Sequence, residues 1–138
     1  MDLKEAAAVR ISSRSFIGPI GEEDFMYLQG LAEKYSRLAE VEIGLFHGLA
    51  PCFRGFQASY GMFSGVEDGF LLGGEHHTMD HLEKLGYYGE FLVLEATARG
   101  LGTCWVGGTY RKDMLPPSSP DPVDCIIVVG KVEPRKWK

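Results

Sequence analysis

The stretch Gly86–Gly108, GYYGEFLVLEATARGLGTCWVGG, restricts the fold of this 138-residue chain more than any other. Its first part continues a mostly apolar helix that is predicted to begin near Thr78 and to run to Arg99. Gly100 suits the position after a helix, where the backbone turns left-handed, and Leu101 can then fold back onto the last turn. A short β-type segment follows. Because about twenty residues of weakly charged helix are not stable alone in water, this unit must be buried.

Hydrophobic periodicity, strand-favouring composition and prolines predict the other elements. We expect helices over 3–10 and 22–38, strands over 41–49, 66–72, 103–106 and 124–132, a helical turn over 111–115 and an extended connector over 116–122. The resulting order is helix, helix, strand, strand, long helix, strand, strand. It predicts one α+β domain over residues 1–138, with helices packed on a small mixed sheet.

The charge and cysteine content exclude several classes of protein. The net charge of −5, from 19 acidic and 14 basic residues, argues against a broad nucleic-acid-binding surface. No apolar run reaches membrane-spanning length, and the N-terminus lacks an apolar signal core. The three cysteines, Cys52, Cys104 and Cys125, form neither a CxxC pair nor a disulfide framework. We therefore expect a cytoplasmic protein with buried, reduced cysteines and no membrane or nucleic-acid partner.

Two segments carry groups that could bind a cofactor. Arg10, Ser12 and Arg14 place two guanidiniums and a hydroxyl within five residues, a donor set that fits a phosphate dianion. The alternative is a solvated basic turn after a helix. The backbone N–H groups of residues 102–108 could donate to the acceptors of a planar cofactor, since glycine permits close approach. The alternative there is a helix-to-strand turn that needs glycine only for its geometry.

Two further patterns have competing interpretations. His77 and His81 are spaced i, i+4, so both could face one metal ion beside Glu75 or Asp80. A solvated helix start explains the same residues, and we expect no metal. A ridge of small residues lies on the long helix, where it could receive a helix of a second copy or serve ordinary core packing. Its members are Gly89, Val93, Ala96 and Gly100.

Several motifs, in order along nearly the whole chain, resemble those of one known family. They are RxSxRxF over 10–16, IGPI over 17–20, GYYGE over 86–90, LEATARGLGTCWVGG over 94–108 and VVGK over 128–131. This sequence resembles the nitroreductase family of FMN-dependent oxidoreductases. It is most similar to the branch in which two half-domains of one chain form a pseudo-dimer, and this chain resembles the N-terminal half.

The resemblance implies a mixed sheet flanked by helices, a long central helix in a dimer core, and FMN at the dimer interface. Arg10, Ser12 and Arg14 would bind the FMN phosphate. A basic residue after the last strand would complete that site, and Lys131, Arg135 and Lys136 all remain candidates. The isoalloxazine edge would lie along the backbone of Cys104, Trp105, Val106, Gly107 and Gly108. No side chain is assigned as catalytic.

One segment departs from the family pattern. Most members carry a ring-contacting segment with Asn and Gln, whereas Ala50–Tyr60 contains Gln57 and no Asn. In the two-half branch that segment belongs to the second half. A homodimer, or pairing with a second half-domain, would therefore supply the other wall of the flavin site.

The expected function is transfer of electrons from NAD(P)H through FMN to a small nitroaromatic or quinone-type acceptor. A non-catalytic or flavin-sequestering remnant that keeps the scaffold is the alternative. A third possibility is a small metal-binding protein built on His76, His77 and His81.

Overall fold

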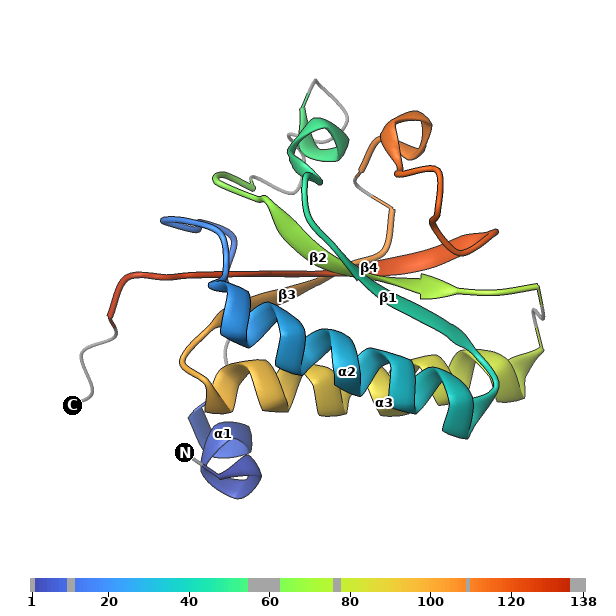
Figure 1. Cartoon of the computed structure of the whole chain (residues 1–138), viewed down its shortest axis with the longest axis horizontal. Helices are drawn as coiled ribbons and strands as arrows, with labels where there is room; N and C mark the ends of the chain where they lie inside the picture. The colour runs from blue at the N-terminus through green and yellow to red at the C-terminus, as the bar shows by residue number, and fades with distance from the viewer. Residues whose placement is uncertain (1, 10–11, 55–62, 76–77, 109, 135–138) are drawn as a thin grey trace.

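A four-stranded sheet with two long helices on one face forms the centre of the molecule (Figure 1). The computed structural model describes residues 2–9, 12–54, 63–75, 78–108 and 110–134. The elements in chain order are α1 (Leu3–Val9), α2 (Glu22–Ala39), β1 (Glu42–Phe46), η1 (Ala50–Phe53), β2 (Asp68–Gly73), α3 (Met79–Ala98), β3 (Gly102–Val106), η3 (Lys112–Met114) and β4 (Val123–Gly130). The α+β class and the long helix are confirmed.

The strands are ordered β1-β2-β4-β3, and all three neighbouring pairs are antiparallel. Parallel pairing among the described residues is limited to two isolated bridges, Ser12 with Thr103 and Ser15 with Ser64. The mixed character that we expected therefore comes from short bridges beside an antiparallel sheet. β3 is an edge strand, and one of the two parallel bridges lies on its outer side.

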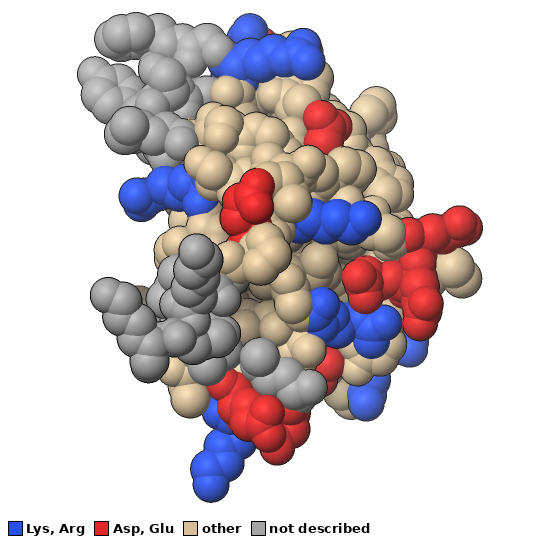
Figure 2. Space-filling model, turned by 90° about the vertical axis from the view of Figure 1, so that its left-hand side faces the viewer, with Lys and Arg blue, Asp and Glu red and all other residues tan. Residues whose placement is uncertain are grey.

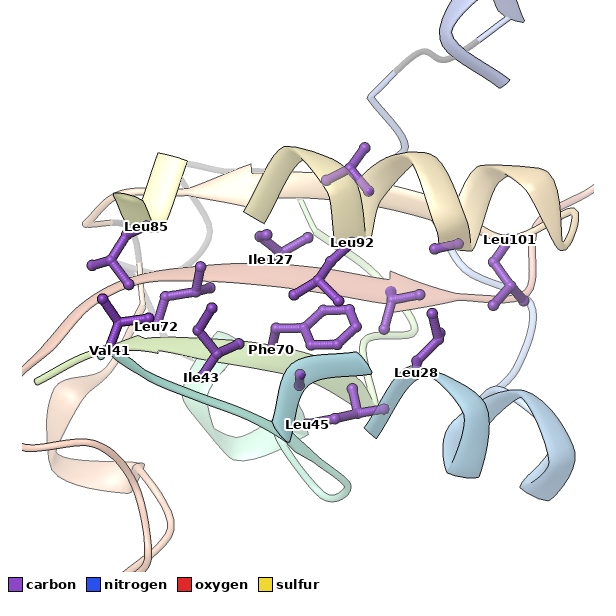
Figure 3. Close-up of a cluster of buried hydrophobic side chains, with 14 of the residues drawn as sticks. Leu28, Val41, Ile43, Leu45, Phe70, Leu72, Leu85, Leu92, Leu101 and Ile127 are labelled. Atoms are coloured by element: carbon purple, nitrogen blue, oxygen red, sulfur yellow. The ribbon is translucent and has the colours of Figure 1, made fainter. Parts of the chain in front are cut away.

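The two faces of the sheet carry two separate apolar clusters. The helical cluster lies between the sheet and helices α2 and α3 (Figure 3). It includes Leu28, Ile43, Phe70, Leu72, Leu92 and Ile127. The opposite cluster is covered by η1, η3 and irregular segments, and it includes Leu49, Cys52, Leu71, Val106, Tyr110, Ile126 and Val128. Burial on both sides explains the uninterrupted apolar run of β4.

The C-terminus of α3 has the predicted geometry. Gly100 has φ +80°, in the left-handed region, and the N–H of Leu101 donates to the carbonyl of Ala96 over 3.0 Å. Leu101 folds back into the helical cluster. The ridge on α3 faces the subunit's own core: a Cβ on Gly89 would lie 2.3 Å from the indole of Trp105. Self-association through that ridge is therefore wrong for the part that contains Gly89.

The end of α2 is joined to the edge strand β1 by a side chain. Ser36 Oγ accepts from the N–H of Ile43 over 3.0 Å and lies 3.1 Å from the carbonyl oxygen of the same residue. It is also 2.8 Å from the carbonyl oxygen of Ala32 within α2. The outward-facing backbone groups of Ile43 are thus satisfied by the helix that precedes the strand.

Several predicted boundaries were wrong. β1 ends at Phe46 rather than Leu49, because the chain turns at His47 and Gly48, where φ is +75°. β4 ends at Gly130, after which Lys131 pairs through a single bridge. The proline-rich connector is not fully extended, since the N–H of Ser119 donates to the carbonyl of Pro116 and closes a turn.

Candidate functional site

The segment 12–20, which we call the strap, crosses one end of the sheet. Its first contact is with β3, where the N–H of Ser13 donates to the carbonyl of Thr103 over 2.8 Å. Further along, the N–H of Lys131, just after β4, donates to the carbonyl of Gly18 over 2.9 Å. The strap therefore runs from the outer side of β3 to the end of β4 and brings together two motifs that are far apart in the sequence.

The last part of the strap is fixed by one apolar and one polar contact. The ring of Phe16 is buried, and a Cβ on Gly130 would lie 2.8 Å from it, so glycine is needed for this packing. The N–H of Ile20 donates to the carboxylate of Asp68 on β2 over 2.9 Å. Asp68 is fully buried, so this bond forms away from solvent. The strap is consequently anchored on β3, β4 and β2 in turn.

The strap and the end of β4 carry the described cations of the candidate phosphate site. Ser12, Arg14 and Lys131 are all exposed. Within the described residues, neither Arg14 nor Lys131 forms an ion pair, although other basic residues such as Arg99 and Arg111 do. Unpaired cations beside a hydroxyl suit an anion such as a phosphate dianion. Arg10 and Arg135, also predicted to bind it, lie outside the described residues, as does Lys136.

Figure 2 views the molecule from the side on which the strap and the C-terminal part of the chain lie. Basic and acidic side chains are interspersed there with uncharged surface. This side of the molecule therefore carries charges of both signs rather than a continuous basic surface. This distribution agrees with the net charge of −5 and favours a small anionic ligand over an extended polyanion.

The side chains of β3 are used inside the fold. Cys104 and Val106 lie in the opposite cluster, whereas Trp105 packs against α3. The indole N–H of Trp105 donates to a carboxylate oxygen of Glu90 over 3.2 Å, and its ring fills the space left by Gly89. These contacts join the GYYGE motif to the glycine-rich motif. Because the side chains of the predicted flavin-edge residues Cys104–Val106 are used in this way, their backbone is the part that remains for a ligand.

The turn after β3 is exposed, and it continues the outer edge of the strand. Thr103 directs its carbonyl outward to the strap. Because hydrogen-bonding directions alternate along an antiparallel strand, Trp105 presents its N–H and C=O to the same side. Gly107 and Gly108 are exposed, and nothing lies within 4 Å of a Cβ built on either. A planar molecule could approach this backbone closely.

Sequence reasoning missed a pair of residues at the strap end of the sheet. His47 Nδ1 is 2.5 Å from the second carboxylate oxygen of Asp68, and its ring stacks on Phe25 at 3.8 Å between ring centroids. The side chain of His47 is 60% exposed although its partner carboxylate is buried. The available signal was Asp68, an acidic residue in a predicted strand.

The histidines predicted as a solvated helix start are only partly described. His76 and His77 lie outside the described residues, whereas His81 is buried, which corrects the surface interpretation. Its backbone N–H donates to Oγ1 of Thr78, and its Nε2 is 3.8 Å from a carboxylate oxygen of Asp124. No group of three His, Cys, Asp or Glu residues among the described ones is arranged to hold a metal ion.

The cysteines are free thiols in protected positions, as expected. Cys52 and Cys104 are buried, and Cys125 is half-buried. Burial, and then the charge of Asp124, raise the pKa of Cys125 to about 11. Burial also raises the pKa of Cys52, with a smaller contribution from Asp113. Neither thiol has the low pKa of a nucleophilic cysteine.

Comparison with known proteins provides an independent finding. The family model described as "Putative TM nitroreductase" matches residues 2–138. No curated protein matches the sequence. Within the described residues, no helix combines the length and apolar character needed to cross a lipid bilayer.

Solved nitroreductase structures share the fold. The FMN-dependent nitroreductase NfnB from Mycobacterium smegmatis, solved with NADPH, has a TM-score of 0.70 at 14% identity, over 96% of this chain and 90% of its own. A nitroreductase family protein from Clostridium novyi NT has a TM-score of 0.66 at 15% identity, over 95% and 86%. An FMN-dependent nitroreductase from Clostridium difficile R20291 has a TM-score of 0.65 at 15% identity, over 95% and 88%.

Proposed function

The chain belongs to the nitroreductase family, and on that basis we propose that it is an FMN-dependent oxidoreductase. The observation that carries the proposal is the strap, which brings the exposed Ser12 and Arg14 to the same end of the sheet as Lys131. Two of the similar structures are described as FMN-dependent nitroreductases, which supports the choice of flavin.

The described residues fit the phosphate and the ring edge of FMN. Arg14 and Lys131 are cations without ion-pair partners in the described part of the chain, and Ser12 adds a hydroxyl donor. Beyond the strap contact at Thr103, the outward-facing backbone of Trp105 and the exposed, side-chain-free turn at Gly107 suit a flat ring system. FMN supplies the redox chemistry when bound, with electrons from NAD(P)H passing to a nitroaromatic or quinone-type acceptor.

The protein's own groups would bind FMN and orient it. Ser12, Arg14 and Lys131 would neutralise and hold the phosphate, and the edge of β3 would orient the ring by backbone hydrogen bonds. Trp105 and Glu90 hold β3 rigidly against α3, so its backbone is fixed before a ligand arrives. No side chain is assigned a proton-transfer step.

A second wall of the site would come from another copy or from a second half-domain, in a cytoplasmic protein. This part of the proposal rests on the motif order and on the segment Ala50–Tyr60, of which residues 55–60 lie outside the described ones. The chain would then act as a homodimer, or as the N-terminal half of a pseudo-dimer. Because Gly89 is packed against Trp105, the pairing surface would lie on other faces of the subunit.

The test is FMN binding by the purified chain, followed by NAD(P)H oxidation with a nitroaromatic or quinone acceptor. Replacing Arg14 and Lys131 together by Ala should weaken FMN binding at least tenfold, because hydrogen bonds to charged groups contribute about 1.5–3 kcal/mol each. The charge-matched control replaces Lys34 and Arg37 together by Ala, since both are exposed on the far part of α2, and it should bind normally. Dissociation constants from quenching of FMN fluorescence provide the measurement.

A colourless protein whose melting temperature does not rise with excess FMN would refute the proposal, because a ligand of the folded state must stabilise it. That result would favour the remnant domain instead. Normal FMN binding by the double variant of Arg14 and Lys131 would show that the strap is not the phosphate site.

A further inference from the structure

We propose that His47 is a positioning residue that holds the strap in its cofactor-binding arrangement through the buried carboxylate of Asp68. The inference rests on the proposed function, because it concerns the segment that would bind the FMN phosphate. It assigns to His47 a role that neither the motif pattern nor the family match provides.

The buried carboxylate of Asp68 depends on two hydrogen-bond donors. Asp68 is fully buried, and a buried charge is costly unless hydrogen bonds and an opposite or polar partner compensate it. Two groups do so: the N–H of Ile20 at 2.9 Å and Nδ1 of His47 at 2.5 Å. Each carboxylate oxygen therefore has one donor, and removal of either donor leaves the charge under-compensated.

The imidazole of His47 is fixed by one contact at its edge and one at its face. Its edge is fixed by Asp68 and its face by the ring of Phe25, which is nearly parallel to it at an interplanar angle of 13°. Phe25 lies in the first turn of α2, and its N–H donates to the carbonyl of Gly21, directly after the strap. One imidazole thus contacts both the anchor of the strap and the helix that follows it.

The bond between Ile20 and Asp68 also affects the placement of Ser12 and Arg14. The strap has hydrogen-bonded contacts at Thr103, Ser64, Lys131 and Asp68, and the carbonyl of Arg14 accepts from the N–H of Ser64 over 2.9 Å. Removal of His47 leaves the buried carboxylate of Asp68 with one donor, which loosens the end of the strap at Ile20 and lowers the population of molecules in which Ser12 and Arg14 are correctly placed. An affinity falls in proportion to the fraction of protein in the binding-competent state.

The experiment compares three variants. His47→Ala removes the donor, whereas His47→Asn keeps an amide N–H close to the position of Nδ1 and should restore function. Ser36→Ala is the matched control, because it removes a side-chain-to-backbone bond at the other end of β1, distant from the strap. Each variant is measured for FMN affinity and, without FMN, for hydrogen exchange of the strap amides.

His47→Ala should raise the FMN dissociation constant about tenfold, and His47→Asn should stay within about threefold of the original chain. The Ile20 amide should exchange faster in His47→Ala than in either other variant. Ser36→Ala should lower the melting temperature but leave FMN affinity unchanged, which separates positioning from general destabilisation.

An unchanged FMN affinity in His47→Ala would overturn the inference, as would an Ile20 amide protected equally in His47→Ala and Ser36→Ala. If the original chain binds no FMN, the proposed function fails. The exchange measurement on the cofactor-free protein then still decides whether His47 holds the strap.

Discussion

The two faces of the sheet differ in how they are covered, although alternate residues of the same strands supply both. On one face α2 and α3 contribute regularly spaced apolar side chains to a single cluster. On the other face η1, η3 and irregular segments cover a second cluster, with Phe16 of the strap at its edge. Helices pack along their whole length, whereas short turns are fixed by a few contacts each.

This difference assigns separate tasks to the two faces. The helical face holds the fold together, because its cluster and the side chains packed against it connect α2, α3 and all four strands. The strap is held by individual hydrogen bonds at the ends and edge of the sheet and by the ring of Phe16, and the turn after β3 is exposed. A site at such positions can be altered without loss of the core, which makes the comparison testable with substitutions on one strand.

The largest expected effect comes from adjacent leucines of β2 that face opposite sides. Leu72→Ala should cost about 4 kcal/mol of unfolding free energy and Leu71→Ala about 3 kcal/mol, since irregular segments can relax into a cavity more easily than packed helices. Both side chains are fully buried in the folded chain, so a difference in exposure does not affect the comparison of the two variants. Urea unfolding gives both values, and a larger loss for Leu71→Ala would contradict the contrast between the faces.

An intermediate effect is expected at Gly89, where the helical face contacts β3. Gly89→Ala should destabilise by about 2 kcal/mol, because the added methyl would lie 2.3 Å from the Trp105 ring. Gly86→Ala is the control on the same helix: nothing lies within 4 Å of its Cβ, so it should stabilise by about 0.5–1 kcal/mol. Thermal unfolding of both variants measures the two effects, and equal shifts of the melting temperature would show that the Trp105 contact is unimportant.

The smallest effect concerns the rate at which Cys125 is alkylated rather than the stability of the fold. With its pKa raised to about 11, Cys125 should form about a hundredfold less thiolate at neutral pH than an ordinary thiol with a pKa near 9, so alkylation should be slow. The raised pKa stabilises the folded state fully below about pH 9, and this contribution is lost as the pH rises to 11. Mass spectrometry after iodoacetamide treatment, with and without denaturant, measures the protection; rapid modification of the native protein would contradict it.

The sequence was most informative where local rules determine the structure. The end of α3 followed from Gly100 and Leu101, because a left-handed glycine cap depends on neighbouring residues alone. β4 followed from its continuous apolar run, which requires burial on both faces. The motifs around Ser12 and Lys131 were also recognised, but their meeting at one end of the sheet depends on strand order, which periodicity does not encode.

Residues whose roles depend on distant partners were missed. His47 was placed within a strand that ends one residue earlier, and its partner Asp68 is supplied by the next strand. Likewise, Gly89 was interpreted as part of a surface for another helix, whereas the indole that fills its space comes from β3. In each case the deciding contact joins residues whose neighbourhood is set only by tertiary packing.

The hydroxyl of Ser36 has a consequence for association of the protein. It accepts from the outward N–H of Ile43 on the edge strand β1 and shares its one hydrogen between the carbonyls of Ala32 and Ile43, so a foreign strand approaching at Ile43 meets a donor that is already engaged. Exposed edges of sheets are templates for aggregation unless something covers them. α2 therefore protects β1 at Ile43 against pairing with a foreign strand, and the strap does the same for β3 at Thr103.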